Sequence, residues 1–467
     1  MRRQCRASPG TPRRRGSSKR RDRANHRGKH RSRGSSKGLH NPRINNRRRR
    51  RHRHRHRSNH GDRHNRNHSH RRRMTNRLRH RRRGNRVRDR YITWPEMTWH
   101  VMQFTICANY LFMPQVLYDL AGRSSWLIVI VALLPACLGI WSACALYSRF
   151  PDQRIGEFMP KIVGRPLAIL LGLLLAGYWY GGSVIDVAVF VLYSSTTVVT
   201  STPTLVLLLL HASVVTFIGL LGIKTLVRVV DLLLYTILPF LVFMYFWPLF
   251  STKLELDQML PLRVSDFRPD TLQVALGMIG MYHGYHVLFL TGPALSSGRR
   301  GAALATVIGT LLAGFSFLVF TVYPLIAFGW PAVADLTFPM GSFLAIMAPP
   351  SASFPIRRLD FFVLGFLRLI MTIAAMTYFW LSIQVITDVI WPGRYRRPPA
   401  ALTLALGIGI VVLGRYILGM PTLLALVQVW MPMSTATVAV VIALAVVAWL
   451  RNVNSTTRSG KRGASHG

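Results

Sequence analysis

One apolar stretch of this 467-residue chain is broken in its middle by glycines and histidines. It reads Gly277-Met278-Ile279-Gly280-Met281-Tyr282-His283-Gly284-Tyr285-His286 and lies inside the longer apolar segment 271–295. Glycine is a poor helix former, and a polar side chain inside a membrane span needs a partner. We therefore predict a transmembrane helix that is interrupted here, with freed backbone groups that a ligand, water or polar neighbours must satisfy. We expect at least one of His283 and His286 to be neutral and bonded to a carbonyl, although a titrating histidine at this depth could instead couple to protons.

A second apolar segment, 97–118, carries Cys107-Ala108-Asn109-Tyr110-Leu111-Phe112-Met113-Pro114. Pro114 removes a backbone donor near Tyr110, and Asn109 is a poor helix former. Each break alone has an ordinary explanation, because prolines kink membrane helices and glycines mark close helix packing. Both breaks, however, fall in the segments that open the two halves of the membrane region, and this coincidence favours interrupted helices in both.

Apolar segments near or above 18 residues recur after Tyr91, each long enough to cross a hydrocarbon core of about 30 Å. Ten are recognised: 97–118, 125–148, 167–198, 203–222, 230–250, 271–295, 301–328, 360–390, 400–419 and 432–450. We therefore predict an all-α polytopic membrane protein of about ten transmembrane helices, arranged as a five-plus-five inverted repeat. The chain then divides into a tail (1–90), a transmembrane domain (91–450) and a short basic tail (451–467).

The loops between these segments predict the orientation. Alternate loops are rich in cations, whereas the loop 253–270 balances its cations with acids. By the positive-inside rule the cation-rich loops are cytoplasmic, which places both termini inside. The cation-rich set comprises Arg149, Arg154, Lys161, Arg165, Lys224, Arg228, Arg299, Arg300, Arg394, Arg396 and Arg397, with Arg451, Arg458, Lys461 and Arg462 in the C-terminal tail.

A few charged residues fall inside the predicted spans. Asp231 and Asp388 lie near span ends, where snorkelling to the interface explains them. Asp186 and Arg368 lie deeper, where an isolated charge suggests a functional role, and a buried pair between them stays open.

The first ninety residues hold 37 of the 60 Lys and Arg against three acids, or +34 of the formal net charge of +44. This segment has no apolar period and repels itself, so we expect it to be disordered. Three explanations stay open: adhesion to anionic lipid headgroups, nonspecific binding of nucleic acid, and a translation start further on, at Met74. Nucleic acid is the less expected partner, because aromatic residues that stack on bases are missing before Tyr91.

Short motifs follow one another along residues 91–450, and their order and spacing resemble the spore-germination permease family. Members of that family are the B subunits of endospore germinant receptors, within the amino acid–polyamine–organocation superfamily. The motifs are Met113-Pro114, Leu120-Ala121-Gly122, Trp126, Arg149-Phe150-Pro151, Glu157-Phe158, Val163-Gly164-Arg165-Pro166, Thr202-Pro203, Pro239, Leu260-Pro261, Thr337-Phe338-Pro339 and Arg358-Leu359-Asp360.

The resemblance implies a leucine-transporter-like fold, a site in the spore inner membrane, and recognition of a small nutrient germinant, commonly an amino acid. It also implies germinant receptor A and C subunits as partners. Cys107 stands where the family has a glycine, and Tyr285 stands where an acidic residue often follows Gly284. Tyr378 matches an aromatic position that lines the family's cavity, and Tyr178 or Tyr180 is similar to another.

We expect the ligand to lie between the two breaks, with its carboxylate at the positive end of a half-helix. The alternative function is an amino acid or polyamine transporter coupled to protons or sodium. An enzyme is not expected, because the membrane region lacks a carboxylate pair, a metal cluster and a nucleophile constellation, and no cofactor or metal is implied. The candidate ligand-binding residues are Cys107, Ala108, Asn109, Tyr110, Tyr178, Gly280, Tyr282, His283, Gly284 and Tyr378.

Overall fold

The computed structural model describes residues 92–107, 109–197, 199–251, 254–260, 271–336, 338–346, 359–394 and 397–454. The basic tail (1–90) and residues 455–467 lie outside these ranges, so the expectations for both tails stay predictions. Regular structure in the described ranges is helical, apart from an isolated bridge between Ile92 and Leu295.

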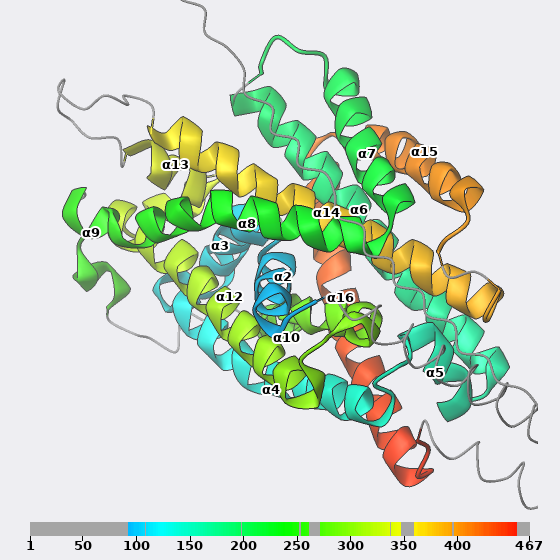
Figure 1. The fold of residues 1–467 in the computed structure, drawn as a ribbon. Helices are drawn as coiled ribbons and strands as arrows, with labels where there is room; N and C mark the ends of the chain where they lie inside the picture. The colour runs from blue at the N-terminus through cyan, green and yellow to red at the C-terminus, as the bar shows by residue number, and fades with distance from the viewer. Residues whose placement is uncertain are drawn as a thin grey trace, which may run out of the picture. The chain divides into compact units, whose positions relative to one another are not determined.

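The predicted apolar segments each coincide with one helix or with the pieces of a broken one (Figure 1). The unbroken helices are α4 (Ser125–Arg149), α6 (Arg165–Thr197), α7 (Thr204–Leu221), α8 (Ile223–Phe246), α12 (Gly298–Phe328), α14 (Leu359–Ile390), α15 (Ala400–Tyr416) and α16 (Met420–Leu450). The broken spans are α2 (Trp94–Ile106) with α3 (Asn109–Ala121), and α10 (Thr271–Met281) with the 3-10 helix η4 (His283–Val287) and α11 (Leu288–Thr291). Short helices in the connections include α5 (Ile155–Ile162), α9 (Pro248–Ser251) and α13 (Pro339–Ile346).

Seven helices in the described ranges are long and apolar enough to cross a membrane: those of α4, α6, α7, α8, α12, α14 and α16. Helix α15 is apolar but has 17 residues. The two broken spans miss this length because each is divided. The predicted start of the last span at residue 432 is wrong, because α16 begins at Met420 and carries Pro432 inside it. Neighbouring helices let a membrane helix tolerate such a proline.

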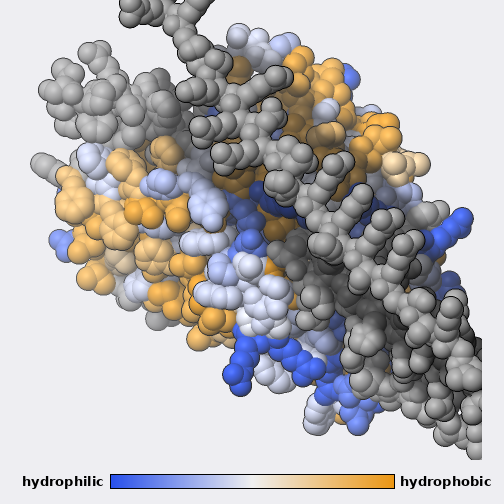
Figure 2. Space-filling view, viewed as in Figure 1, coloured by the Kyte–Doolittle hydropathy of each residue, from blue (hydrophilic) through white to orange (hydrophobic). Residues whose placement is uncertain are grey.

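Helix α14 runs through the middle of the bundle and contacts α2, α5, α6, α7, α8 and α13 (Figure 1). Its sequence is apolar on all sides, which is typical of a helix surrounded by others. Helices α4, α7, α8, α15 and α16 instead expose Leu, Val, Phe and Trp side chains. Figure 2 shows apolar side chains over broad areas of the face in view. Such surfaces suit contact with lipid, where no apolar side chain needs to be hidden.

The C-terminal end of α14 is tied to α5 by a buried ion pair. Arg154 Nε lies 3.1 Å from Asp388 Oδ2, and Arg154 Nη2 lies 3.3 Å from Glu157 Oε1. Gln384 donates to the other Asp388 oxygen at 2.9 Å. Asp388 is 4% exposed, so our expectation that it snorkels to an interface is wrong. A nearby guanidinium stabilises the carboxylate in place of water.

The deeper charges are also buried. Asp186 lies on α6, and the guanidinium carbon of Arg368 on α14 lies 5.0 Å from the centre of the Tyr193 ring, within range of a cation–π contact.

Candidate ligand-binding site

The first break is confirmed at Cys107. Helix α2 begins with a capping box, in which Thr93 and Glu96 satisfy each other's backbone donors, and it ends at Ile106. Cys107 then has φ 32° and ψ −139°, outside the helical region, and α3 starts at Asn109. A positive φ favours glycine. The family that the sequence resembles has a glycine at this position. The cysteine therefore holds a backbone conformation that costs about 1–3 kcal/mol.

The second break is confirmed at Tyr282. Helix α10 ends at Met281, and Tyr282 has φ −79° and ψ 34°. The chain continues as the tighter 3-10 helix η4 before α11 begins. A stretch of 3-10 helix within a span often marks a functional hinge. The break is thus a change of helix type together with one non-helical residue.

Two glycines hold the broken spans against their neighbours. A Cβ atom at Gly284 would overlap Thr105 Oγ1 and the Val101 carbonyl oxygen, both on α2. A Cβ atom at Gly280 would overlap Ser434 on α16. Glycine permits this close approach because it has no side chain. The two breaks therefore lie side by side, with η4 packed directly on the last turns of α2.

Five aromatic rings gather at the breaks, and we call them the aromatic cluster: Phe104, Tyr178, His283, Tyr378 and Trp430. Ring centres of Phe104 and Tyr378 are 4.5 Å apart, and those of Phe104 and His283 are 5.1 Å apart. Tyr178 and Trp430 stack at 4.9 Å with planes 12° apart. All five are buried, and they come from α2, α6, η4, α14 and α16. Aromatic pairs at these separations stabilise one another beyond the burial of their area.

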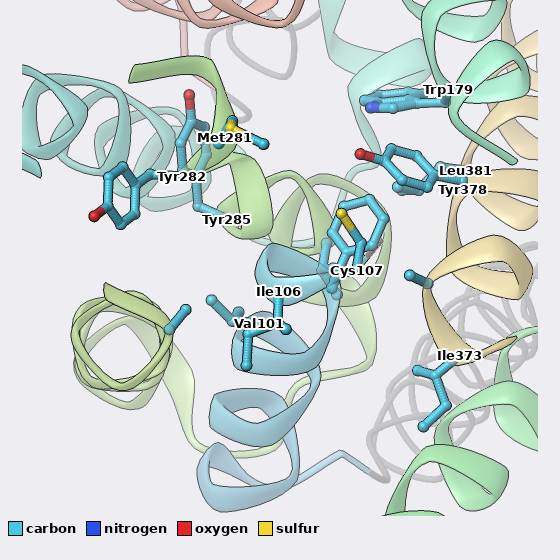
Figure 3. Packing of buried hydrophobic residues seen from close by; sticks show 14 of the residues in the cluster. Val101, Ile106, Cys107, Trp179, Met281, Tyr282, Tyr285, Ile373, Tyr378 and Leu381 are labelled. Carbon is cyan, nitrogen blue, oxygen red and sulfur yellow. The ribbon is translucent and has the colours of Figure 1, made fainter. Parts of the chain in front are cut away.

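Cys107 lies beside this cluster, close to the hydroxyl groups of Tyr178 and Tyr378. Figure 3 shows Cys107 at the end of α2, opposite Tyr378 on α14. A short, weakly polar side chain is thus placed at the break, next to two tyrosines.

The hydrogen bonds of His283 indicate which ring nitrogen carries the proton when the ring is neutral. His283 Nδ1 lies 2.9 Å from the Gly280 carbonyl oxygen, and the Tyr378 hydroxyl lies 2.5 Å from His283 Nε2. A carbonyl only accepts, so the ring proton is on Nδ1 and donates to Gly280. Nε2 is then the acceptor, and Tyr378 donates its hydroxyl proton to it. The expected hydrogen bond between a histidine and a carbonyl is confirmed for His283, and its neutral state stays a prediction.

Two further buried histidines, His286 and His100, also make side-chain hydrogen bonds. The indole N–H of Trp179 donates to His286 Nδ1 at 3.3 Å, so the proton of a neutral His286 is on Nε2. Thr377 donates to the Ile373 carbonyl at 2.8 Å and accepts from His100 Nε2 at 2.9 Å. These bonds tie η4 to α6 and α2 to α14.

The predicted site residues divide into four groups. Cys107, Tyr178, His283 and Tyr378 lie together at the breaks. Gly280 and Gly284 lie there too, but they face neighbouring helices. The Tyr282 side chain points away from the cluster, donates to the Val129 carbonyl oxygen at 2.8 Å and packs on Phe317. Ala108 and the side chains of Asn109 and Tyr110 lie outside the described residues.

Sequence reasoning missed Phe104 and Trp430. Neither residue interrupts an apolar run, so local composition carries no sign of them. Gly182 on α6 is a partial signal: a Cβ atom there would lie 3.0 Å from the Tyr378 ring and 3.1 Å from Trp430. A glycine in the middle of a long span often marks a place where a large side chain approaches.

The arrangement of the helices is that of known membrane proteins of leucine-transporter-like fold. One similar structure is Mhp1, a nucleobase-cation-symport-1 family transporter, in a closed conformation with bromovinylhydantoin bound. Its TM-score is 0.51 at 11% identity, over 71% of this chain and 73% of that chain. Another is MhsT in complex with L-phenylalanine, with a TM-score of 0.53 at 15% identity, over 74% of this chain and 88% of that chain. At these identities the likeness shows the fold alone.

Residues 91–416 match the family model described as spore germination protein, and the chain belongs to that family. No curated protein matches the chain. It is accordingly a multi-pass membrane protein of the spore germination protein family with a leucine-transporter-like fold, and as a member of that family it is not an enzyme.

Proposed function

We propose that this chain is the membrane-embedded recognition subunit of a nutrient germinant receptor. A small molecule, such as an amino acid, binds between the two broken spans beside the aromatic cluster. Binding favours one arrangement of the bundle, and the difference in ligand affinity between arrangements triggers germination.

The observation that supports this proposal most is that the two helix breaks lie side by side. Gly284 packs on α2 within one turn of Cys107, and Phe104 contacts His283 across the same point. Each break frees backbone groups, which a bound polar ligand can satisfy. Helix α3 starts at Asn109, so its positive dipole end is available to a carboxylate at this break.

Family membership supports the cellular setting. We propose that the protein acts in the spore inner membrane with germinant receptor A and C subunits. The cation-rich loops support cytoplasmic placement of both termini.

A second candidate is transport of an amino acid or polyamine with protons or sodium. The similarity to a structure named as a transporter favours it, because the same fold and the same breaks serve transport. Uptake of radiolabelled amino acid into proteoliposomes distinguishes the two: the receptor binds without sustained accumulation, whereas the transporter accumulates substrate under an ion gradient.

The proposal is tested by measuring ligand binding to the full-length protein in lipid nanodiscs. The first measurement is the shift in melting temperature that each of the twenty L-amino acids produces. His283→Phe removes the hydrogen bonds to Tyr378 and Gly280 that hold η4 at the break, so we expect about a tenfold loss of affinity, the equivalent of about 1.4 kcal/mol and of one to two neutral hydrogen bonds. His211→Phe is the matched control, because His211 is also a buried membrane histidine but stacks on Phe190 at 3.9 Å. Spores with His283→Phe should fail to lose optical density with the amino acid that wild-type spores respond to. Unchanged affinity in His283→Phe, or no stabilisation by any amino acid, would contradict the proposal.

A further inference from the structure

Helix α5 lies in the connection between α4 and α6, at the end of the bundle where the cation-rich loops are found (Figure 1). It packs on α6, α14 and α16. A helix of eight residues is not stable by itself in water, so α5 depends on the face that it buries against these neighbours. It can therefore leave its place as a unit while the long helices stay formed. The buried face comprises Ile155, Gly156, Phe158, Met159 and Ile162.

Both ends of α5 are bonded to long helices. At its start, Arg154 forms the buried ion pair with Asp388 near the end of α14. Gly156 permits this approach, because a Cβ atom there would overlap the Asp388 side chain. At its end, Arg451 at the end of α16 donates to the carbonyl oxygen of Ile162 at 2.6 Å, which satisfies a helix-terminal acceptor. Two polar contacts thus fasten a helix that packs by one face.

The junction of α5 with α6 has the properties of a hinge. Gly164 separates the two helices and has φ 87°, a conformation that glycine adopts without steric cost. A Cβ atom at Gly164 would meet nothing within 4 Å, so no packed side chain restrains this turn. The helix can therefore rotate about Gly164 once its polar contacts are released.

A column of buried rings runs from α5 to the second break. Phe158 on α5 stacks on Phe150 at the end of α4, with ring centres 5.0 Å apart and planes 11° apart. Phe158 also meets Phe289 on α11 edge to face at 6.5 Å, and Phe289 stacks on His286 of η4 at 5.9 Å. None of these four side chains is more than 2% exposed. His286 lies one turn from His283 of the aromatic cluster, so α5 supplies the base of a packed column beneath that cluster.

We propose that α5 is a latch. While Arg154 is paired with Asp388, Phe158 seals this end of the region where the two breaks meet, and release of α5 from α14 opens it. Asp388 and Tyr378 lie ten residues apart on α14, about 15 Å along the helix, so one rigid element carries both the latch contact and a member of the aromatic cluster. The inference rests on the proposed function only in taking that region as the ligand site, and it supplies the two arrangements between which binding selects.

Cys107 provides a natural reporter of this seal. Its thiol is 1% exposed at the first break, close to Tyr378. The full-length protein carries Cys5→Ala, Cys137→Ala and Cys144→Ala, so that Cys107 is the remaining cysteine, and is inserted in vesicles of known orientation. The membrane-impermeant reagent 2-sulfonatoethyl methanethiosulfonate is added on one side or the other, and the rate of mixed-disulfide formation is followed by mass spectrometry. No amino acid is present, so the result does not depend on ligand binding.

Two variants release the latch in different ways. Arg154→Gln leaves the Asp388 carboxylate buried without its counter-charge, which favours the arrangement in which water reaches it. Phe158→Ala removes the base of the ring column and keeps the ion pair. We expect each variant to speed modification of Cys107 about tenfold or more from the side of the cation-rich loops, which corresponds to about 1.4 kcal/mol in the opening equilibrium. Arg165→Gln is the matched control, because it removes an exposed cation just beyond α5 and should change the rate by less than about twofold.

The two-sided measurement separates a released latch from a damaged fold. An unchanged rate in either variant would overturn the inference. Equal acceleration from both sides would overturn it as well, because the variants would then loosen the whole bundle. The same increase in Arg165→Gln would also overturn it, since the effect would follow net charge and not the ion pair. The proposed function is decided separately by amino acid binding, so it stands or falls independently of the latch.

Discussion

Replacing Tyr378 with phenylalanine removes one oxygen atom from the centre of the site. That oxygen donates its proton to His283 Nε2 at 2.5 Å, and the tyrosine ring packs on Phe104 at 4.5 Å. Phenylalanine keeps the ring contact, so the change acts on the hydrogen bond. Tyr378 and His283 are both fully buried, so water does not replace the lost donor. His283 Nε2 is left as a buried acceptor without a partner.

The cost follows from this geometry. A neutral hydrogen bond contributes about 1 kcal/mol net, and a buried acceptor left unpaired brings the total to about 1–3 kcal/mol. His283→Phe alone leaves the Tyr378 hydroxyl unpaired in the same way. The double variant removes both partners, so its cost should be smaller than the sum of the single costs by about 1–2 kcal/mol. A shift of His283 to its other tautomer would not help, because the bond to Gly280 would then be lost.

The assay is equilibrium unfolding of the full-length protein in mixed micelles, followed by tryptophan fluorescence. Tyr180→Phe is a matched control, because the Tyr180 hydroxyl donates to the Leu406 carbonyl oxygen at 2.8 Å, away from the cluster. It should show no coupling to His283. If the costs of Tyr378→Phe and His283→Phe add to within about 0.3 kcal/mol, the two side chains are not coupled and the hydrogen bond between them does not stabilise the protein.

Two other predictions concern stability and ligand response. Arg154→Gln removes the partner of the buried Asp388 carboxylate, so the free energy of unfolding should fall by about 3 kcal/mol, and adding Asp388→Asn should restore most of it. Gly284→Leu forces a side chain into the backbone of α2 at Val101 and should cost about 1–3 kcal/mol. Gly284→Leu should also abolish the ligand response while leaving membrane insertion intact. Unfolding in mixed micelles checks both costs, and ligand binding to the inserted protein checks the response.

Clear results would contradict these expectations. If Arg154→Gln unfolds like the wild type, or if Asp388→Asn adds to its cost instead of relieving it, the ion pair does not hold α5 on α14. A normal response of Gly284→Leu at the usual ligand concentration would show that the close packing of η4 on α2 is not needed for recognition.

Several features of the fold depend on local properties of the sequence and could be predicted from it. The length of an apolar run must match the thickness of the hydrocarbon core, so the helices were found with errors mainly at their ends. Pro432 misled the prediction for α16, because tertiary neighbours allow a proline inside a membrane helix. The break at Tyr282 was visible from the glycines and histidines around it, because glycine is a poor helix former. The break at Cys107 was signalled by Asn109, which is a poor helix former, whereas Pro114 lies inside α3.

The direction in which each side chain points could not be predicted, because it depends on how helices distant in sequence rotate and cross. Trp430 reaches His283 from nearly 150 residues away, and no local signal marks it. Tyr282 turns to α4 although its neighbour His283 turns to α14. Asp388 meets Arg154 only when α5 folds back on the end of α14. The sequence by itself determined the class of protein, the spans and the places where two of them break, since these follow from local hydrophobicity and backbone preference. Tertiary structure alone decided which donors and rings surround those breaks, because that depends on the packing of five separate elements.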